Sequence, residues 1–185
     1  MRSITLSLCA IAVSAILVSG CVDEPGTPHV TLMRPSMTDA DLLTYLAAAD
    51  TGEIEEGRLA RQRAATEDVQ AYGERMIQEH RSLLDQAKGV AGLNLAADAG
   101  PKGARLLSEH VSMMETFKNK TGLAFDTAYL EHTIMVHQMI IRTMDRAAQE
   151  RRQAAVQRVL DDARPVLQRH LETARALQRT IVTGH

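Results

Sequence analysis

Residues 124–149 read AFDTAYLEHTIMVHQMIIRTMDRAAQ. Apolar residues recur in this stretch every three or four positions, as they do on one face of an α-helix. The same face carries two ionisable residues, Asp126 and His137, which lie three helical turns apart. The stretch therefore predicts a helix whose buried face is partly polar. The apolar members of that face are Leu130, Ile134, Ile140, Ile141 and Met144.

The composition of the whole chain is also that of a helical protein. Its 185 residues are 45% hydrophobic and 3% aromatic, with no Trp and only five Pro. Strong helix formers are abundant and β-branched or aromatic runs are few, which favours an all-α domain. The length suits one domain. The formal charge of −2 indicates no basic face, so we expect no nucleic acid partner.

Residues 1–20 have the pattern of a signal peptide. Arg2 is their only charge, and the apolar run from Ile4 to Val18 is shorter than the roughly 20 residues of a membrane-spanning helix. The small residues before Cys21 resemble the lipobox of bacterial lipoproteins, in which the cysteine is acylated and cleavage occurs before it. We therefore expect a lipoprotein signal peptide, with Cys21 carrying palmitate-type acyl chains. The alternative is an ordinary secretory signal that contains a cysteine.

The residues after the predicted cleavage site indicate the location. Val22 stands where an Asp would resemble the inner-membrane retention signal of enteric bacteria. We therefore expect an outer-membrane lipid anchor, with the domain facing the periplasm. Residues 21–37 contain three Pro and one Gly and show no periodicity, which predicts a flexible tether.

The helical pattern runs from Thr38 to Val182. It predicts helices over about residues 38–64, 66–89, 101–121, 124–149 and 153–182. Pro165 should kink the last helix or divide it. Four long helices and a short one predict an antiparallel four-helix bundle over residues 38–182, with an additional short helix.

The predicted helices place ionisable residues where apolar side chains are expected. These are Glu53, His80, Asp126, His137 and His170. Buried ionisable groups cost several kcal/mol unless they are paired or bound to a metal, and bundle cores are places where such side chains bind metals. No His has Glu three residues before it, so the usual di-iron pattern is absent. The set suits a single transition-metal ion, Fe, Zn or Cu, although the residues lie at different heights in their helices.

Neighbouring polar residues are assigned lesser roles. Glu56 lies at the edge of the predicted buried face of its helix. Tyr129 and Glu56 are expected to hydrogen-bond behind the metal ligands. His110 is interpreted as a core residue of the short helix, and His132 as a solvated residue.

Four segments carry a family resemblance: residues 51–60 (TGEIEEGRLA), 76–80 (MIQEH), 125–129 (FDTAY) and 164–170 (RPVLQRH). They resemble the bacterial "predicted outer membrane protein" family, domain of unknown function 4142, which is assigned to the ferritin-like group. The resemblance spans about residues 38–178 and implies a ferritin-like bundle. It also implies that the family's polar positions fall on the five ionisable residues above and on Tyr129. Arg164 stands where the family usually has Leu.

Two functions are consistent with the sequence. The first is a metal-binding lipoprotein with a stress or redox role. The second is a non-catalytic structural or interaction module of the cell envelope, in which the inward polar residues form a hydrogen-bonded network and the partner is an envelope protein or a second copy. No catalytic residue is assigned, because no nucleophile or phosphate-binding motif is present. Without a metal, no cofactor is expected.

Overall fold

The structure, a computed structural model, describes residues 37–91 and 100–184. Within these ranges it contains five helices and no strand, which confirms the all-α fold. The predicted signal peptide and nearly all of the predicted tether lie outside the described residues. None of the described helices has the length and apolar character that a membrane span requires. The helices are α1 (Asp39–Arg63), α2 (Glu67–Ala91), α4 (Gly100–Lys118), α5 (Leu123–Ala147) and α6 (Ala154–Thr183).

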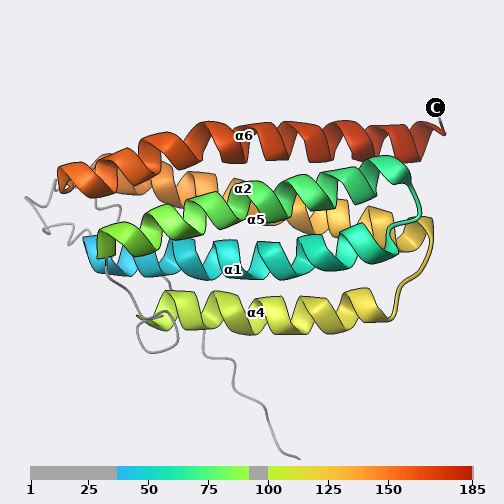
Figure 1. Cartoon of the computed structure of the whole chain (residues 1–185), viewed down its shortest axis with the longest axis horizontal. Helices are drawn as coiled ribbons and strands as arrows, with labels where there is room; N and C mark the ends of the chain where they lie inside the picture. Colours follow the sequence, from blue (N-terminus) through green and yellow to red (C-terminus); the bar gives the residue numbers. More distant parts are fainter. Residues whose placement is uncertain (1–36, 92–99, 185) are drawn as a thin grey trace, which may run out of the picture. The chain divides into compact units, whose positions relative to one another are not determined.

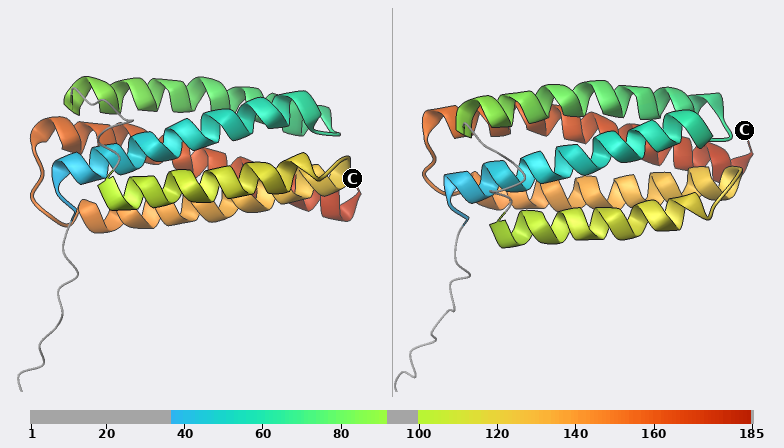
Figure 2. Two further views of the ribbon diagram at one scale, coloured as in Figure 1. Left: turned by 90° about the horizontal axis from the view of Figure 1, so that it is seen from below. Right: turned by 60° about the horizontal axis from the view of Figure 1, so that its bottom comes forward.

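Four of these helices form a closed bundle. Around the bundle, α1 packs against α2, α2 against α6, α6 against α5, and α5 against α1. Each helix runs antiparallel to its two neighbours (Figure 1). The shorter α4 lies outside this quartet (Figure 2). It packs mainly against α1, and near its end Phe117 packs against aromatic rings of α5. The antiparallel four-helix bundle with an additional short helix is thereby confirmed.

Helix α1 is the central element, because it contacts α2, α4 and α5. It begins with a cap: the backbone N–H of Asp41 donates to the side chain of Thr38, and the Asp41 carboxylate accepts from the backbone N–H of Thr38. Three carboxylates, Asp50, Glu53 and Glu56, follow one another at three-residue intervals along α1 and are all buried. The neighbours of α1 on its different sides must therefore supply partners for these carboxylates.

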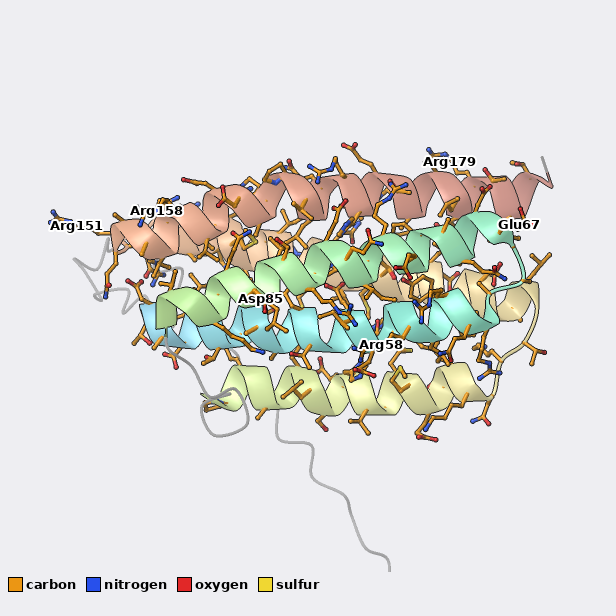
Figure 3. All side chains as sticks on the ribbon, in the orientation of Figure 1. Arg58, Glu67, Asp85, Arg151, Arg158 and Arg179 are labelled. Atoms are coloured by element: carbon orange, nitrogen blue, oxygen red, sulfur yellow. The ribbon has the colours of Figure 1, made fainter. Side chains whose placement is uncertain are left out.

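Pro165 does not divide the last helix. Helix α6 is continuous from Ala154 to Thr183, although its ribbon changes direction in the first half (Figure 1). Pro165 and Asp161, the residue one turn before it, are both exposed. The carbonyl that Pro165 leaves without a helical partner can therefore meet water. The outer face of α6 is polar, and the exposed Arg158 and Arg179 point away from the bundle (Figure 3).

Two glycines allow α1 and α2 to approach closely. A Cβ atom built on Gly73 would lie 2.8 Å from the carbonyl oxygen of Gly57 and 2.9 Å from the backbone nitrogen of Arg61. A Cβ atom on Gly57 would lie 2.9 Å from the carbonyl oxygen of Gly73. No residue with a side chain fits without moving the two backbones apart. This contact lies one turn beyond Glu53 on α1, so it sets the separation of the helices close to that carboxylate.

We expect Gly73→Ala to lower the free energy of unfolding by about 1–3 kcal/mol, because its methyl group meets backbone atoms that cannot rotate away. Chemical denaturation followed by circular dichroism measures this loss. The matched control is Gly89→Ala, since a Cβ atom on Gly89 meets nothing within 4 Å. Alanine there should leave stability unchanged or raise it by up to about 1 kcal/mol. A Gly73→Ala protein as stable as the parent would contradict the close approach.

Candidate metal centre

One ionisable residue from each helix of the quartet meets in the core. Glu53 comes from α1, His80 from α2, His137 from α5 and His170 from α6, and each lies within two residues of the midpoint of its helix. Because neighbouring helices run antiparallel, their midpoints lie at one level of the bundle. All four residues are at most 3% exposed.

The three imidazole rings form a compact triangle. Their centroids are 5.0 Å apart for His80 and His170, 5.3 Å for His137 and His170, and 5.5 Å for His80 and His137. Each ring offers a nitrogen, and these nitrogens all lie within 4.8 Å of one another. Two nitrogens bound to one tetrahedral zinc would be about 3.3 Å apart, given Zn–N bonds of roughly 2.0–2.1 Å. The triangle therefore needs only small side-chain movements to bind an ion.

Each imidazole is held from outside the triangle through its other nitrogen. His80 Nδ1 lies 2.8 Å from Asp50 Oδ1, His170 Nε2 lies 2.9 Å from Glu79 Oε2, and His137 Nδ1 lies 3.0 Å from the carbonyl oxygen of Thr133. These oxygens accept, so the ring nitrogens facing them carry hydrogen. The inward nitrogens are Nε2 of His80, Nε2 of His137 and Nδ1 of His170. The last two lie 3.1 Å apart and share a hydrogen bond, whereas His80 Nε2 has no hydrogen-bond partner among the described residues. Metal-binding histidines are held in this way by carboxylates and carbonyls.

The Glu53 carboxylate lies among these rings without satisfied hydrogen bonds. Its Oε1 is 2.8 Å from His137 Nδ1 and its Oε2 is 3.2 Å from His80 Nε2. Both contacts are close, but neither has the alignment of a hydrogen bond, since the His137 Nδ1–H is directed to Thr133. Both Glu53 oxygens and His80 Nε2 are therefore buried polar atoms without a hydrogen-bond partner among the described residues. Such atoms are costly and rare in folded proteins.

The cluster shifts the proton affinities of its members strongly. Burial raises the pKa of Glu53, but the neighbouring His137 and His80 outweigh it and bring it down to about 2. Burial lowers the pKa of His80, but Glu53 and the hydrogen bond to Asp50 outweigh it and raise it to about 9. Burial, together with His80 and His137, lowers the pKa of His170 to about 2. In the absence of a metal, the cluster thus holds charged and neutral groups side by side.

The donor set fits a transition-metal ion. Three imidazole nitrogens and one carboxylate suit Zn, Fe or Cu, whereas Ca and Mg prefer oxygen donors only. Among the described residues, the other group with converging donors consists of Asp50, Glu53 and His80. It overlaps the first, and its Asp50 already accepts from the outer nitrogen of His80. His80 is shared by this group and the imidazole triangle, and Glu53 lies beside His80 in this group.

Asp126 is not brought to this cluster. Its buried carboxylate accepts hydrogen bonds from the backbone N–H groups of Ala65 and Thr66, at 2.8 and 3.0 Å, and from the Thr66 hydroxyl at 2.9 Å. Asp126 thus satisfies the turn between α1 and α2, where the first N–H groups of a helix lack helical partners. Its place on the buried face of α5 is as expected, but its role is to fasten that turn.

Tyr129 and Glu56 do not hydrogen-bond to the four central residues. The Tyr129 hydroxyl is buried without a hydrogen-bond partner among the described residues. Glu56 Oε1 instead contacts His110 Nδ1 at 2.9 Å and His132 Nε2 at 3.1 Å. The prediction that His132 is solvated was wrong, since it is only 9% exposed. It lies on the side of α5 that faces Glu56 of α1 and Phe117 of α4, so a fifth helix covers a face that four helices would leave open.

The residues that hold the imidazoles were missed in the sequence. Asp50 lies three residues before Glu53, and Glu79 immediately precedes His80. The spacing of Asp50 from Glu53 indicated a shared helical face, which was a usable signal. Glu79 looks like a surface residue by periodicity, and only its contact with α6 reveals its role.

The comparison with protein families identifies the family of the chain. The model of the family described as "Domain of unknown function (DUF4142)" matches residues 25–177. The chain belongs to this family. The match spans all four central residues and confirms the family resemblance, while the family's description names no reaction. No curated protein and no solved structure matches this DUF4142 chain.

We expect the metal-free protein to be most stable near pH 6.5 and less stable on either side. The pKa of His80 is raised from 6.5 to about 9. Its contribution to the free energy of unfolding is therefore fully present below pH 6.5 and is lost as the pH rises through 9. The pKa values of Glu53 and His170 are lowered to about 2, so their contributions are lost as the pH falls, below 4.5 for Glu53 and below 6.5 for His170.

Urea denaturation of the chelator-treated protein between pH 4 and 10 measures this profile. The loss of stability between pH 6.5 and 9 should be on the order of 2 kcal/mol, and His80→Gln should reduce it. A stability that stays level across this interval in the parent would contradict the assigned charge state.

Proposed function

We propose that this protein binds a single first-row transition-metal ion in its core through Glu53, His80, His137 and His170. The observation that carries the proposal is the Glu53 carboxylate, whose two oxygens are buried beside three imidazoles without a hydrogen bond. An ion among these groups would pair with the carboxylate and with the inward imidazole nitrogens. It would thereby remove the cost of the unsatisfied atoms.

The chain's own residues prepare this site before an ion arrives. Asp50, Glu79 and the Thr133 carbonyl fix the ring orientations, so one nitrogen of each ring faces inward. An ion would replace the hydrogen bond between His137 Nε2 and His170 Nδ1, and its binding would release the proton of His80. The Tyr72 hydroxyl donates to the backbone carbonyl of His170 at 3.0 Å, which holds α6 in register. Bound Fe or Cu would supply one-electron redox chemistry, the basis for a role in stress protection, whereas Zn would act without a change of oxidation state.

A structural role is the second candidate. The pairs Asp50–His80 and Glu79–His170 are well-formed contacts of 2.8 and 2.9 Å, as expected of a hydrogen-bonded network in a non-catalytic envelope module that binds an envelope protein or a second copy. This reading leaves both oxygens of Glu53 unsatisfied, which is why we favour the metal. The two candidates differ in whether the protein contains an ion.

Protein purified without a histidine tag should contain close to one equivalent of Fe, Zn or Cu by mass spectrometry. Glu53→Gln keeps the size of the side chain but removes the charge, and should lose most of the metal. The matched control is Glu56→Gln, since Glu56 is a buried carboxylate one turn along the same helix and should leave the metal content unchanged. Asp50→Asn should retain the ion with about 10–100-fold weaker affinity, because it loosens His80.

A parent protein that is empty as purified, and still empty after incubation with Fe(II), Zn(II) and Cu(II), would contradict metal binding and favour the structural candidate. Loss of metal from Glu56→Gln to the same extent as from Glu53→Gln would also contradict the assigned ligands.

We further propose that the protein is a lipoprotein anchored in the outer membrane through acylated Cys21, with the helical domain in the periplasm. The support is the sequence of residues 1–21: a single charge, a short apolar run and small residues before a cysteine. Several acyl chains on one residue are sufficient for firm anchoring.

In a Gram-negative host, the mature protein should begin at Cys21, carry acyl chains and sediment with the outer membrane. Mass spectrometry of the N-terminal peptide and membrane fractionation measure this. Cys21→Ser should abolish acylation and membrane association, whereas Cys9→Ser should change neither, because Cys9 lies within the predicted signal peptide. Acylation that persists in Cys21→Ser would contradict the proposal.

A further inference from the structure

A second feature of the molecule lies between α1, α4 and α5. These helices enclose a chamber of about 400 Å³, because α4 packs against α1 but touches α5 only sparsely. Its volume lies within the range of roughly 300–1,000 Å³ that is usual for small-molecule sites. The chamber meets the surface beside Met135, which lines it and is 54% exposed. It can therefore admit a molecule from solvent.

Most of the chamber wall is apolar, and methionines are prominent in it. Met113 of α4 and Met135 and Met139 of α5 line it together with Leu106 and Val136. Methionine side chains are flexible, and their sulfur atoms make favourable contacts with aromatic rings. Such a wall suits an aromatic group better than a polar one.

One part of the wall is polar and carries unused hydrogen-bonding capacity. Glu56 Oε1 contacts His110 and His132, at 2.9 and 3.1 Å. Glu56 Oε2 accepts no hydrogen bond from any described residue and is not among the atoms sealed from solvent. His132 also lines the chamber, is 9% exposed, and has an Nδ1 atom without a partner in the described part of the chain. A buried carboxylate oxygen with free capacity favours a ligand that donates a hydrogen bond.

We propose that this chamber binds a small phenolic molecule, whose ring contacts the methionine wall and whose hydroxyl donates a hydrogen bond to Glu56 Oε2. The charged residues of the chamber wall favour a ligand that is an uncharged hydrogen-bond donor. The carboxylates Glu53, Glu56 and Glu109 line the chamber beside His110 and His132, so an anionic ligand would be repelled, and an ammonium ion would lose its hydration among apolar side chains.

The chamber is distinct from the metal centre but adjoins it. Glu53 belongs to both, since it lines the chamber and also lies between His80 and His137. The proposed ligand contacts Glu56, one helical turn away, and needs no ion. Binding to the metal-free protein therefore tests the chamber independently of the proposed function.

The probe is para-butylphenol, added to the full-length chelator-treated protein with its methionine methyl groups labelled for NMR. We expect saturable binding with one molecule per chain, and nuclear Overhauser contacts from the ring to the methyl groups of Met113, Met135 and Met139. Met76 and Met144 are fully buried elsewhere in the core and should show none. Butylbenzene lacks the hydroxyl and should bind about tenfold more weakly, the effect of roughly one hydrogen bond to a carboxylate.

Two variants locate the site. Glu56→Gln should weaken para-butylphenol about fivefold to tenfold and leave butylbenzene unchanged. Ala48→Phe should abolish binding of both, because Ala48 lines the chamber; Ala104→Phe on the exposed face of α4 is its control. The proposal is overturned by absence of binding to the parent, by contacts to Met76 or Met144 instead, or by equal weakening of both probes in Glu56→Gln. Should Ala48→Phe fail to fold, the methyl contacts and Glu56→Gln still decide.

Discussion

The structure depends on one electrostatic constraint, the burial of the Glu53 carboxylate in the centre of a helical bundle. A carboxylate in that position is costly unless it is paired with a charged group or bound to a metal. Three helices each supply an imidazole at the level of Glu53, and Asp50, Glu79 and the Thr133 carbonyl hold those imidazoles in place. The close approach of α1 and α2 at Gly57 and Gly73 lies next to this level, so packing and electrostatics are coupled at the same place.

The central position of α1 explains why a small protein can support two polar sites. One side of this helix presents Glu53 to the quartet, and another presents Glu56 to α4 and α5. A four-helix bundle alone would leave Glu56 and His132 facing solvent. The additional helix covers them while remaining separated from α5 over much of its length, which creates the chamber. The short helix contributes Leu106 and Phe117 to the core, and it also encloses a second site.

Much of this could be predicted from the sequence, because helical periodicity is a local property. The five helices and the inward faces of Glu53, His80, His137 and His170 follow from spacing alone. The expectation that these residues lie at different heights was wrong, because each lies near the midpoint of its helix and neighbouring helices run antiparallel. The position of Asp126 near the start of its helix, by contrast, placed it at the end of the bundle, where it holds a turn. The burial of His132 and the role of Glu79 depend on which helix packs where, and periodicity within one helix contains no such information.

The central claim is that Glu53 and three imidazoles hold one ion, and X-ray absorption at the metal edge tests it most directly. The loaded protein should give a first shell of nitrogen and oxygen at about 2.0–2.2 Å, with the outer-shell scattering of three imidazoles. In His170→Gln the outer-shell scattering should fall to that of two imidazoles. A shell of oxygen alone, a sulfur ligand from methionine, or a spectrum unchanged in His170→Gln would contradict the claim.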